Sequence, residues 1–389
     1  MPSESNSAAN GGKMPAIRNA ANEIVITSDS EAGQLLVGTC ALCVSLSSDP
    51  IQVKKMLGAG NSGTVILLPG GTRVQKIVSF WRGDDFVIKE QCKSLRNEIA
   101  AYKHLPQDHH RFAKFLGSSD NGKDRVTIDL EYLPNNTLHE YLRGYTVREF
   151  LDTKRRDDEE TRADKERRMS RRHDSIPLLQ RACWALEAVD GISALHALNV
   201  LHCDIKPENM GLDAQLNVRI FDFAGSSVCG SEPMSMESTR YHKPRNPRDY
   251  YGVDTECFAL GSSIYHIVTG VRPYDKVPDE EVEHLYARQE FPDLYGEALK
   301  DEPLKGSTGN TAPDTIGTSP VTGMLLFADA IRKCWYGEFA TSAEILEALK
   351  SEVVRTFNEE DLRYISEKSG IELEKEVTGG PAANHSDDQ

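Results

Sequence analysis

Two neighbouring runs of sequence decide the fold. Residues 201–212 read LHCDIKPENMGL, and residues 218–225 read VRIFDFAG. Together they place three carboxylates, an amide and a lysine within a short span of the chain. Each of these side chains alone would more often be a surface or turn residue, so the interpretation depends on their order, their spacing and the sequence around them.

The sequence upstream of these runs has the pattern of a small sheet. Strands are expected at 52–57, 64–68, 73–78 and 126–130, where short β-rich runs are bounded by turn residues such as the PGG at 69–71. Between the third and fourth of these, apolar residues fall on one face of a helix expected at 94–105. The apolar run at 35–46 is too short to cross a membrane and favours a further strand.

A glycine-rich run, GAGNSGTV at 58–65, lies between the first two of these strands. The spacing of Gly58, Gly60 and Gly63 also occurs in dinucleotide-binding folds, but there a helix follows the last glycine, whereas here a strand is expected. A glycine loop between two strands can fold over nucleotide phosphates, because no Cβ keeps the backbone amides away from them.

The sequence after residue 133 has a different character. Helices are expected at 137–150, 177–198, 255–269 and 341–357, with a few short strands near 200–222. A β-rich lobe at 49–133 is therefore followed by a larger helical lobe at 134–357, which is an α+β architecture.

These motifs, in this order, resemble the eukaryotic protein kinase family over roughly residues 51–357. The resemblance implies the bilobal protein-kinase-like fold, with a β-rich N-lobe carrying one main helix and a mostly helical C-lobe. The form Asp-x-Lys-Pro-Glu-Asn at 204–209 is typical of the Ser/Thr-directed branch of the family. Asp-Phe-Ala-Gly at 222–225 stands in place of Asp-Phe-Gly, and the chain is most similar to a divergent branch seen in fungi.

The resemblance also assigns roles around ATP and Mg²⁺. Phosphoryl transfer depends on positioning and on charge neutralisation, so it needs a carboxylate near the attacking hydroxyl, cations on the phosphates and oxygen ligands for magnesium. Asp204 is the expected base, and Lys206 is expected on the transferring phosphate. Asn209 and Asp222 are the expected Mg²⁺ ligands, and Gly58, Gly60 and Gly63 would cover the phosphates.

Two lysines compete for the role of phosphate anchor, which pairs with a helical acid expected to be Glu98. Lys89 lies in the better motif string, FVIK, but only nine positions separate it from Glu98. That distance is too short to finish a strand, turn and place the acid in mid-helix. Lys76 leaves 22 positions and follows the PGG turn directly, so the spacing favours Lys76.

The adenine pocket is expected around residues 130–136, LEYLPNN, which resemble the family's hinge between the lobes. Adenine would bind backbone groups of Glu131 and Leu133, while Leu130 would close the back of the pocket. Val65 and Val74 would cover the ring. Any of these aliphatic side chains could equally be plain core.

Four positions depart from the family pattern. Cys203 replaces the Arg that often precedes the catalytic Asp and pairs with a phosphate on the activation segment, which suggests activity that does not depend on that phosphate. Ala224 replaces a Gly. Arg245 stands where Glu is expected, and the family's partner Arg is absent as well, so no charge is expected to be stranded. Glu256 replaces an Asp that anchors the catalytic loop.

Composition and charge restrict the class of partner. The 389 residues are 39% hydrophobic and 27% charged, as in globular proteins long enough for two lobes. With 60 acidic and 45 basic residues the net charge is -15, which disfavours nucleic acid and anionic membranes. The eight cysteines show no disulfide spacing and no secretory signal is recognisable, so reduced thiols in the cytoplasm or nucleus are expected. No feature specifies an oligomeric state.

Three segments are expected to lie outside the lobes. Residues 1–48 have the composition of a mostly disordered tail, and residues 358–389, with nine acidic and three basic residues, that of a solvating acidic tail. A charged insertion at 152–175 is expected to be a solvated helix or a disordered segment, rather than a docking or nuclear-import segment.

The sequence therefore predicts a Ser/Thr protein kinase that transfers the γ-phosphate of ATP to a protein hydroxyl. The alternative, suggested by the four departures, is a pseudokinase that binds ATP and acts as an interaction scaffold. A small-molecule kinase on the same fold is disfavoured, because such enzymes usually lack the equivalent of Lys206.

Overall fold

The structure is a computed structural model. It describes residues 55–79, 85–144, 175–235, 237–246, 251–295 and 324–373, together with the backbone of short strands at 24–25, 34–37, 40–43 and 52–53. The predictions for most of residues 1–48, for 152–174 of the charged insertion and for 374–389 lie outside the described residues.

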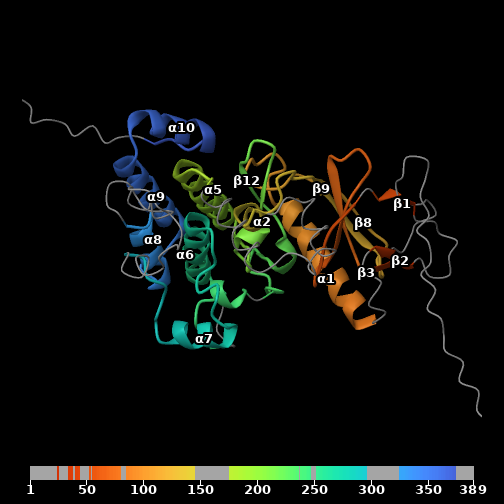
Figure 1. Ribbon diagram of the computed structural model, residues 1–389. Helices are drawn as coiled ribbons and strands as arrows, with labels where there is room; N and C mark the ends of the chain where they lie inside the picture. The colour runs from red at the N-terminus through yellow and green to blue at the C-terminus, as the bar shows by residue number, and fades with distance from the viewer. Residues whose placement is uncertain are drawn as a thin grey trace, which may run out of the picture.

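A five-stranded antiparallel sheet forms the smaller lobe (Figure 1). Its strand order is β5-β6-β7-β9-β8, and its members are β5 (Lys55–Gly60), β6 (Gly63–Leu67), β7 (Arg73–Ile77), β8 (Phe115–Asp120) and β9 (Val126–Glu131). In β9 buried and half-buried residues alternate, as expected for a strand with one face on the core. Strand β8 was not predicted from the sequence.

The helix described in this lobe, α1 (Asp85–His104), begins nine residues before the predicted start at 94. Its buried face includes Leu95, Glu98, Ile99 and Tyr102. Lys89 was expected before the helix; it instead lies within the helix, on its exposed side.

Additional strands lie in the predicted N-terminal tail. β1 (Ile24–Val25) pairs with β4 (Gln52–Val53), and β2 (Gln34–Val37) forms an antiparallel hairpin with β3 (Cys40–Cys43). The prediction of a strand within 35–46 corresponds to this hairpin. The prediction that residues 1–48 are mostly disordered stays a prediction, because most of these residues lie outside the described ranges.

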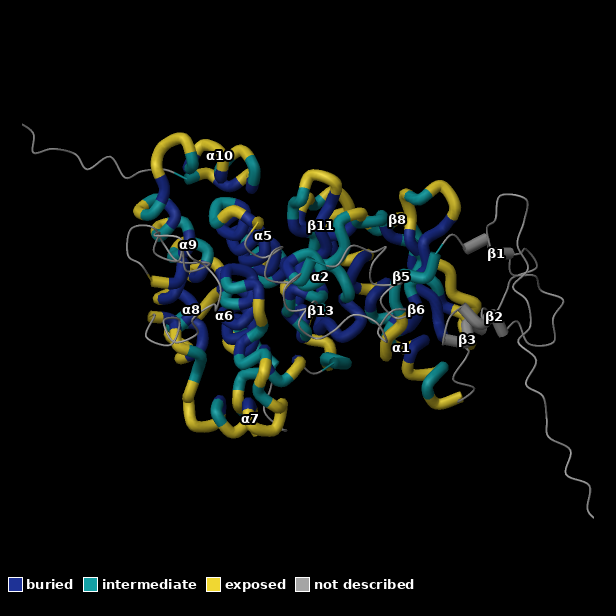
Figure 2. Tube along the Cα trace, viewed as in Figure 1, coloured by how far each residue is buried: buried dark blue, intermediate teal, exposed yellow. Residues whose placement is uncertain are grey.

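The larger lobe is helical. Figure 2 shows α5 and α6 at its centre, and most residues of both helices are buried. The described helices are α2 (Leu138–Leu142), α5 (Leu178–Ala197), α6 (Val253–Thr269), α7 (Asp279–Ala287), α8 (Ala328–Trp335), α9 (Ser342–Thr356) and α10 (Glu359–Ser369). Among these, none has the length and hydrophobicity needed to span a bilayer.

Short elements near the sheet carry the motif residues. The hairpin β11 (Met210–Leu212) and β12 (Val218–Ile220) follows η2 (Pro207–Asn209), and β10 (Val200–Leu201) pairs with β13 (Ser227–Val228). Two further 3₁₀ turns, η3 (Phe223–Gly225) and η4 (Thr239–Tyr241), lie along the segment that follows. The hydrogen bond from Asn97 of α1 to Ala224 and the bridge between Phe112 and Ile220 bring the second motif run against the small lobe.

The prediction of a solvating tail from residue 358 is wrong for its first part. Asn358 caps α10 by accepting hydrogen bonds from the amides of Glu360 and Asp361, at 2.9 and 3.0 Å. Leu362 and Ile365 are buried against the helical lobe. The helical lobe therefore continues to residue 373, because this acidic segment has one apolar face.

Candidate active site

A cleft of about 340 Å³ lies between the two lobes. The predicted phosphate loop, the two hinge residues and both motif runs contribute to its lining. Gly58 and Gly60 line it where an added Cβ would meet nothing within 4 Å, so packing within the protein does not require glycine there. Gly63 is different: its φ is +139°, and a Cβ would lie 2.5 Å from the carbonyl oxygen of Ile77.

Lys76 on β7 lies between two carboxylates. Its Nζ is 2.7 Å from Oε2 of Glu98 on α1 and 2.6 Å from Oδ1 of Asp222. Lys76 and Glu98 are 6% and 0% exposed, so these contacts are largely shielded from water. The structure thus brings Lys76, and not Lys89, to the helical acid, as the spacing argument favoured.

Burial and charge oppose each other in this cluster. Burial alone would lower the pKa of Lys76, but the attraction of Asp222 and Glu98 raises it overall. Burial alone would raise the pKa of Asp222, yet Lys76 brings it below its ordinary value. Lys76 and Asp222 therefore stay charged at neutral pH. For Glu98 burial dominates and raises the pKa, with Lys76 opposing the shift.

The run at 201–212 forms a compact loop around Asp204. Nζ of Lys206 is 2.7 Å from Oδ2 of Asp204 and donates to Oγ of Ser238 at 3.1 Å. Nδ2 of Asn209 donates to the backbone oxygen and to Oδ2 of Asp204, at 2.8 and 3.0 Å. These contacts fix the direction of the Asp204 carboxylate, which a general base requires.

Asp222 has a left-handed backbone, with φ of 66°, at the start of η3. This turn is held from α1, because Nδ2 of Asn97 donates to the carbonyl oxygens of Ala224 and Ser226 at 3.1 and 2.8 Å. Ala224 is accommodated as a buried residue. The glycine that the turn needs is Gly225, where a Cβ would lie 1.9 Å from Oγ of Ser235.

Four aromatic rings connect the lobes behind the cleft. Tyr102 on α1 stacks on Phe115 at 5.5 Å and meets Phe223 edge-on at 4.9 Å between ring centroids, and Phe223 contacts His202 at 5.4 Å. Sequence reasoning did not assign this cluster or the role of Asn97. Only the position of His202 and Phe223 inside the two motif runs could have suggested it.

Glu256 at the start of α6 anchors the loop below Asp204. Its Oε1 accepts a hydrogen bond from the backbone amide of Cys203 at 2.6 Å, and its Oε2 is 2.6 Å from Nε2 of His196. The other ring nitrogen of His196 contacts Oγ of Ser342 at 2.8 Å. Cys203 itself has φ of 63° and is fully buried, and burial raises the pKa of its thiol. The added methylene of Glu256 therefore keeps the anchoring contact expected of an Asp.

Arg245 has a partner that the sequence analysis did not foresee. Its Nη2 is 2.7 Å from Oε2 of Glu237, and its guanidinium lies 4.6 Å from the ring centroid of Tyr251. Burial alone would raise the pKa of Glu237, but hydrogen bonds from His242 and Arg245 lower it. The segment that follows Asp222 is thus held by an internal ion pair.

The hinge residues line the cleft as predicted. The amides of Glu131 and Tyr132 donate to the carbonyl oxygens of Lys114 and Thr72 at 3.0 and 2.9 Å, whereas the amide of Leu133 has no backbone acceptor among the described residues. Val65, Val74 and Leu130 also line the cleft. An apolar slot with a backbone donor fits a flat heteroaromatic ring.

The chemistry of the donor set also fits Mg²⁺. Asn209 and Asp222 both line the cleft, and Nδ2 of Asn209 is engaged by Asp204, which leaves its amide oxygen as the ligand atom. Amide and carboxylate oxygens are the hard ligands that magnesium prefers. Bound there, the ion would neutralise charge on the phosphates.

The two lobes and the cleft between them are those of a protein kinase domain. Comparison with known families agrees: the protein kinase domain matches residues 51–308, and the chain belongs to the protein kinase family. Among relatives, NUAK family SNF1-like kinase 1 of Homo sapiens is 25% identical over 231 residues, which is 58% of this chain and 30% of that protein.

Two other relatives are similar at the same level. Cysteine-rich receptor-like protein kinase 42 of Arabidopsis thaliana is 25% identical over 277 residues, covering 67% of this chain and 37% of the relative. Serine/threonine-protein kinase PDK1 of Cryptococcus neoformans is 24% identical over 120 residues, covering 28% and 10%. The chain therefore spans well under half the length of these relatives.

Proposed function

We propose that this protein is an active Ser/Thr protein kinase that uses ATP and Mg²⁺. The observation that carries the proposal is the position of Lys76, whose ammonium lies within 2.7 Å of both Glu98 and Asp222. This contact joins β7, α1 and the second motif run, so the groups needed at the phosphates are already assembled.

The reaction follows from the same residues. Asp204 orients the substrate hydroxyl and accepts its proton as the oxygen forms a bond to the γ-phosphorus. The bond from the γ-phosphorus to the bridging oxygen breaks, and ADP leaves. Lys206, next to Asp204, and Lys76 supply positive charge to the phosphoryl oxygens as the transfer proceeds.

The segment that follows Asp222 supports activity without phosphorylation. Cys203 offers no cation for a phosphate, and the segment is held instead by the Glu237–Arg245 ion pair and by Tyr251, whose hydroxyl donates to the carbonyl oxygen of Ser235 at 2.6 Å.

The six cysteines whose side chains are described are all free thiols, which supports a reducing compartment, the cytoplasm or nucleus.

The alternative is an ATP-binding pseudokinase acting as a scaffold. Two replacements favour it. Cys203 immediately precedes Asp204, and Ala224 lies two positions after Asp222. The contacts of Glu256 and Asn97 argue against it, because they hold both altered turns in place.

The test is incubation of the full chain with labelled ATP, Mg²⁺ and a mixed protein substrate, followed by phosphoamino-acid analysis. Wild type should form phosphoserine or phosphothreonine, and Asp204→Asn should not. Lys76→Met should also be inactive, while Lys89→Met is the matched control and should keep full activity. No transfer by wild type, together with stabilisation by ATP, would overturn the proposal in favour of the scaffold.

A further inference from the structure

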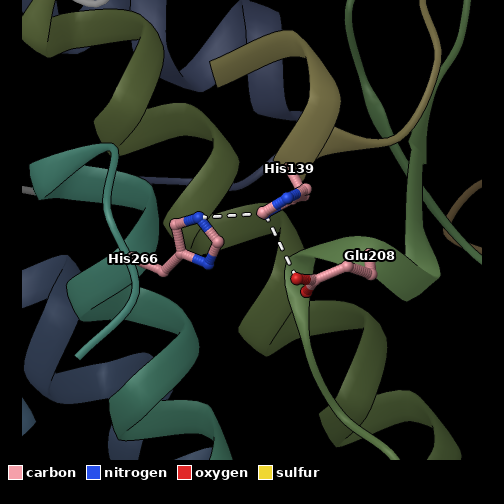
Figure 3. A group of neighbouring side chains, drawn as sticks. All are labelled: His139, Glu208 and His266. Carbon is pink, nitrogen blue, oxygen red and sulfur yellow. Dashed lines mark hydrogen bonds and ion pairs between the residues drawn. The ribbon is translucent and has the colours of Figure 1, made fainter. Parts of the chain in front are cut away.

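Two histidines and a glutamate converge beneath the catalytic loop, at the border of the proposed phosphoryl-transfer site, whose cleft Glu208 also lines (Figure 3). His139 comes from α2, Glu208 from η2 and His266 from α6. Nδ1 of His139 is 3.2 Å from Oε1 of Glu208 and 3.4 Å from Nε2 of His266, and the three ligand atoms lie within 4.8 Å of one another. The three side chains point toward one shared position.

Hydrogen bonding alone satisfies this arrangement poorly. Nδ1 of His139 can carry one proton, yet it faces two neighbours, and 3.4 Å is long for a hydrogen bond between ring nitrogens. The other oxygen of the same carboxylate, Oε2 of Glu208, is buried without a hydrogen-bond partner among the described residues. Some acceptor capacity at this position is therefore unused.

The same distances suit a tetrahedral metal. Bonds of about 2.0–2.1 Å at tetrahedral angles separate neighbouring ligand atoms by roughly 3.3 Å. The two measured separations from His139, 3.2 and 3.4 Å, lie on either side of this value. Imidazole nitrogens combined with one carboxylate favour zinc over magnesium or calcium, which take oxygen ligands.

A second layer of contacts orients one ligand. The hydroxyl of Tyr241 lies 2.7 Å from Nδ1 of His266. If that nitrogen donates its proton to the hydroxyl oxygen, Nε2 is left with the lone pair that a metal needs. Two arginines lie nearby, Arg143 and Arg272, but both contact Asp275, at 3.4 and 2.7 Å. The two arginines, Asp275 and Glu208 together carry no net charge, so as a group they do not repel a cation.

We propose that His139, Glu208 and His266 form a Zn²⁺ site with water as the fourth ligand. The ion would connect α2, the catalytic loop and α6, and it would reach the segment after Asp222 through Tyr241. It would therefore brace the loop that carries Asp204. The proposal concerns metal binding and stability, and it holds whether or not the chain transfers phosphate.

The test uses the full chain, stripped with a chelator, dialysed and then titrated with ZnCl₂. Wild type should bind one zinc per chain by elemental analysis. Its melting temperature should rise by about 5 °C when free zinc is a hundredfold above the dissociation constant. His139→Gln and Glu208→Gln should each lose the bound zinc and this rise. His284→Gln, on the exposed side of α7, is the matched control and should keep both.

A second pair of side chains that could hold zinc lies on the surface, where Sγ of Cys229 is 3.8 Å from Nε2 of His104. His104→Gln should leave zinc binding intact, and X-ray absorption should show nitrogen and oxygen ligands without sulfur. In the presence of chelator, His139→Gln should have the same melting temperature as wild type. Such a result would show that the variant has lost zinc binding and is not misfolded. The proposal is wrong if the folded wild type binds no zinc, if His139→Gln keeps it, or if only His104→Gln loses it.

Discussion

Removal of the Glu256 carboxylate should loosen the catalytic loop. Glu256→Ala leaves the fully buried amide of Cys203 without its 2.6 Å acceptor and also removes the partner of His196. A backbone amide bound to a charged acceptor is worth about 1.5–3 kcal/mol, and an unpartnered buried ring nitrogen costs about 1–3 kcal/mol. Relief of the buried carboxylate offsets part of this sum. We expect a loss of about 3 kcal/mol in unfolding free energy and about 5 °C in melting temperature.

The phosphoryl-transfer activity of Glu256→Ala should fall together with its stability, because Cys203 immediately precedes Asp204. Displacement of that carboxylate should lower kcat by about tenfold or more, measured with labelled ATP. Glu256→Gln keeps an acceptor for the amide and should stay within about 1 kcal/mol of wild type, whereas Glu256→Asp should fall between Gln and Ala because its shorter arm cannot reach both partners. Glu347→Ala, at an exposed ion pair on α9, is the control. A loss below 1 kcal/mol in urea unfolding of Glu256→Ala would refute the reasoning.

Three further outcomes follow from the described contacts. A chain ending at residue 373 should melt within about 1 °C of the full chain, whereas one ending at 358 should lose several degrees because α10 is removed; equal melting temperatures would contradict the packing of Ile365. In Arg245→Ala, Glu237 loses its ion pair, so a protease should cleave the segment that follows Asp222 faster than in wild type. An unchanged cleavage rate would contradict a role of this ion pair in holding the segment. Burial raises the pKa of Glu187 from 4.5 to about 7, so its contribution to stability is present below pH 4.5 and is lost as the pH rises through 7. Glu187→Gln should flatten that loss in urea unfolding between pH 5 and 8, and an unchanged slope would exclude the shift.

The site was more predictable from the sequence than the boundaries of the fold. Spacing alone separated Lys76 from Lys89, because a strand, a turn and half a helix need more than nine residues. Strand β8 carried no such signal: most of FLGSSD is exposed, and its strand conformation comes from pairing with β9, a contact distant in sequence. The early start of α1 was missed because its first turns expose apolar residues such as Phe86.

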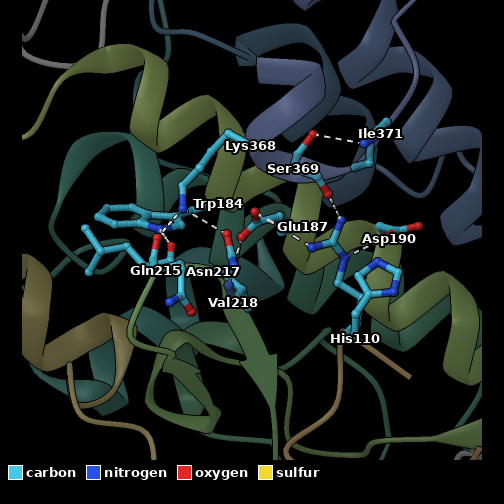
Figure 4. Close-up of polar contacts among 12 residues, drawn as sticks. His110, Trp184, Glu187, Asp190, Gln215, Asn217, Val218, Lys368, Ser369 and Ile371 are labelled. Atoms are coloured by element: carbon cyan, nitrogen blue, oxygen red, sulfur yellow. Dashed lines mark hydrogen bonds and ion pairs between the residues drawn. The ribbon is translucent and has the colours of Figure 1, made fainter. Parts of the chain in front are cut away.

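Helix α10 had a readable signal that its charge obscured. Asn358 is a good cap, and Leu362 and Ile365 have helical spacing, but the count of acidic residues suggested a solvated tail. The structure adds what periodicity cannot show. Nζ of Lys368 donates to Oδ1 of Asn217 at 2.9 Å (Figure 4), and the guanidinium of Arg111 donates to the carbonyl oxygen of Ser369. These polar contacts bind the end of the helix to loops more than 150 positions away in the sequence.

The charged cluster around Lys76 bears on whether the cleft has a role beyond stabilising the fold. Lys76, Glu98 and Asp222 together carry one positive and two negative charges when ionised, and Lys76 and Glu98 are almost completely buried. Such groups are costly to desolvate, and apolar residues of similar volume would often stabilise a fold as well or better. Stability alone therefore gives little reason to keep them together. A nucleotide with its magnesium gives one, because Lys76 can then neutralise phosphate while Asp222 binds the ion. The cluster therefore favours a nucleotide-binding site, as the proposed phosphoryl transfer requires, over a purely structural role.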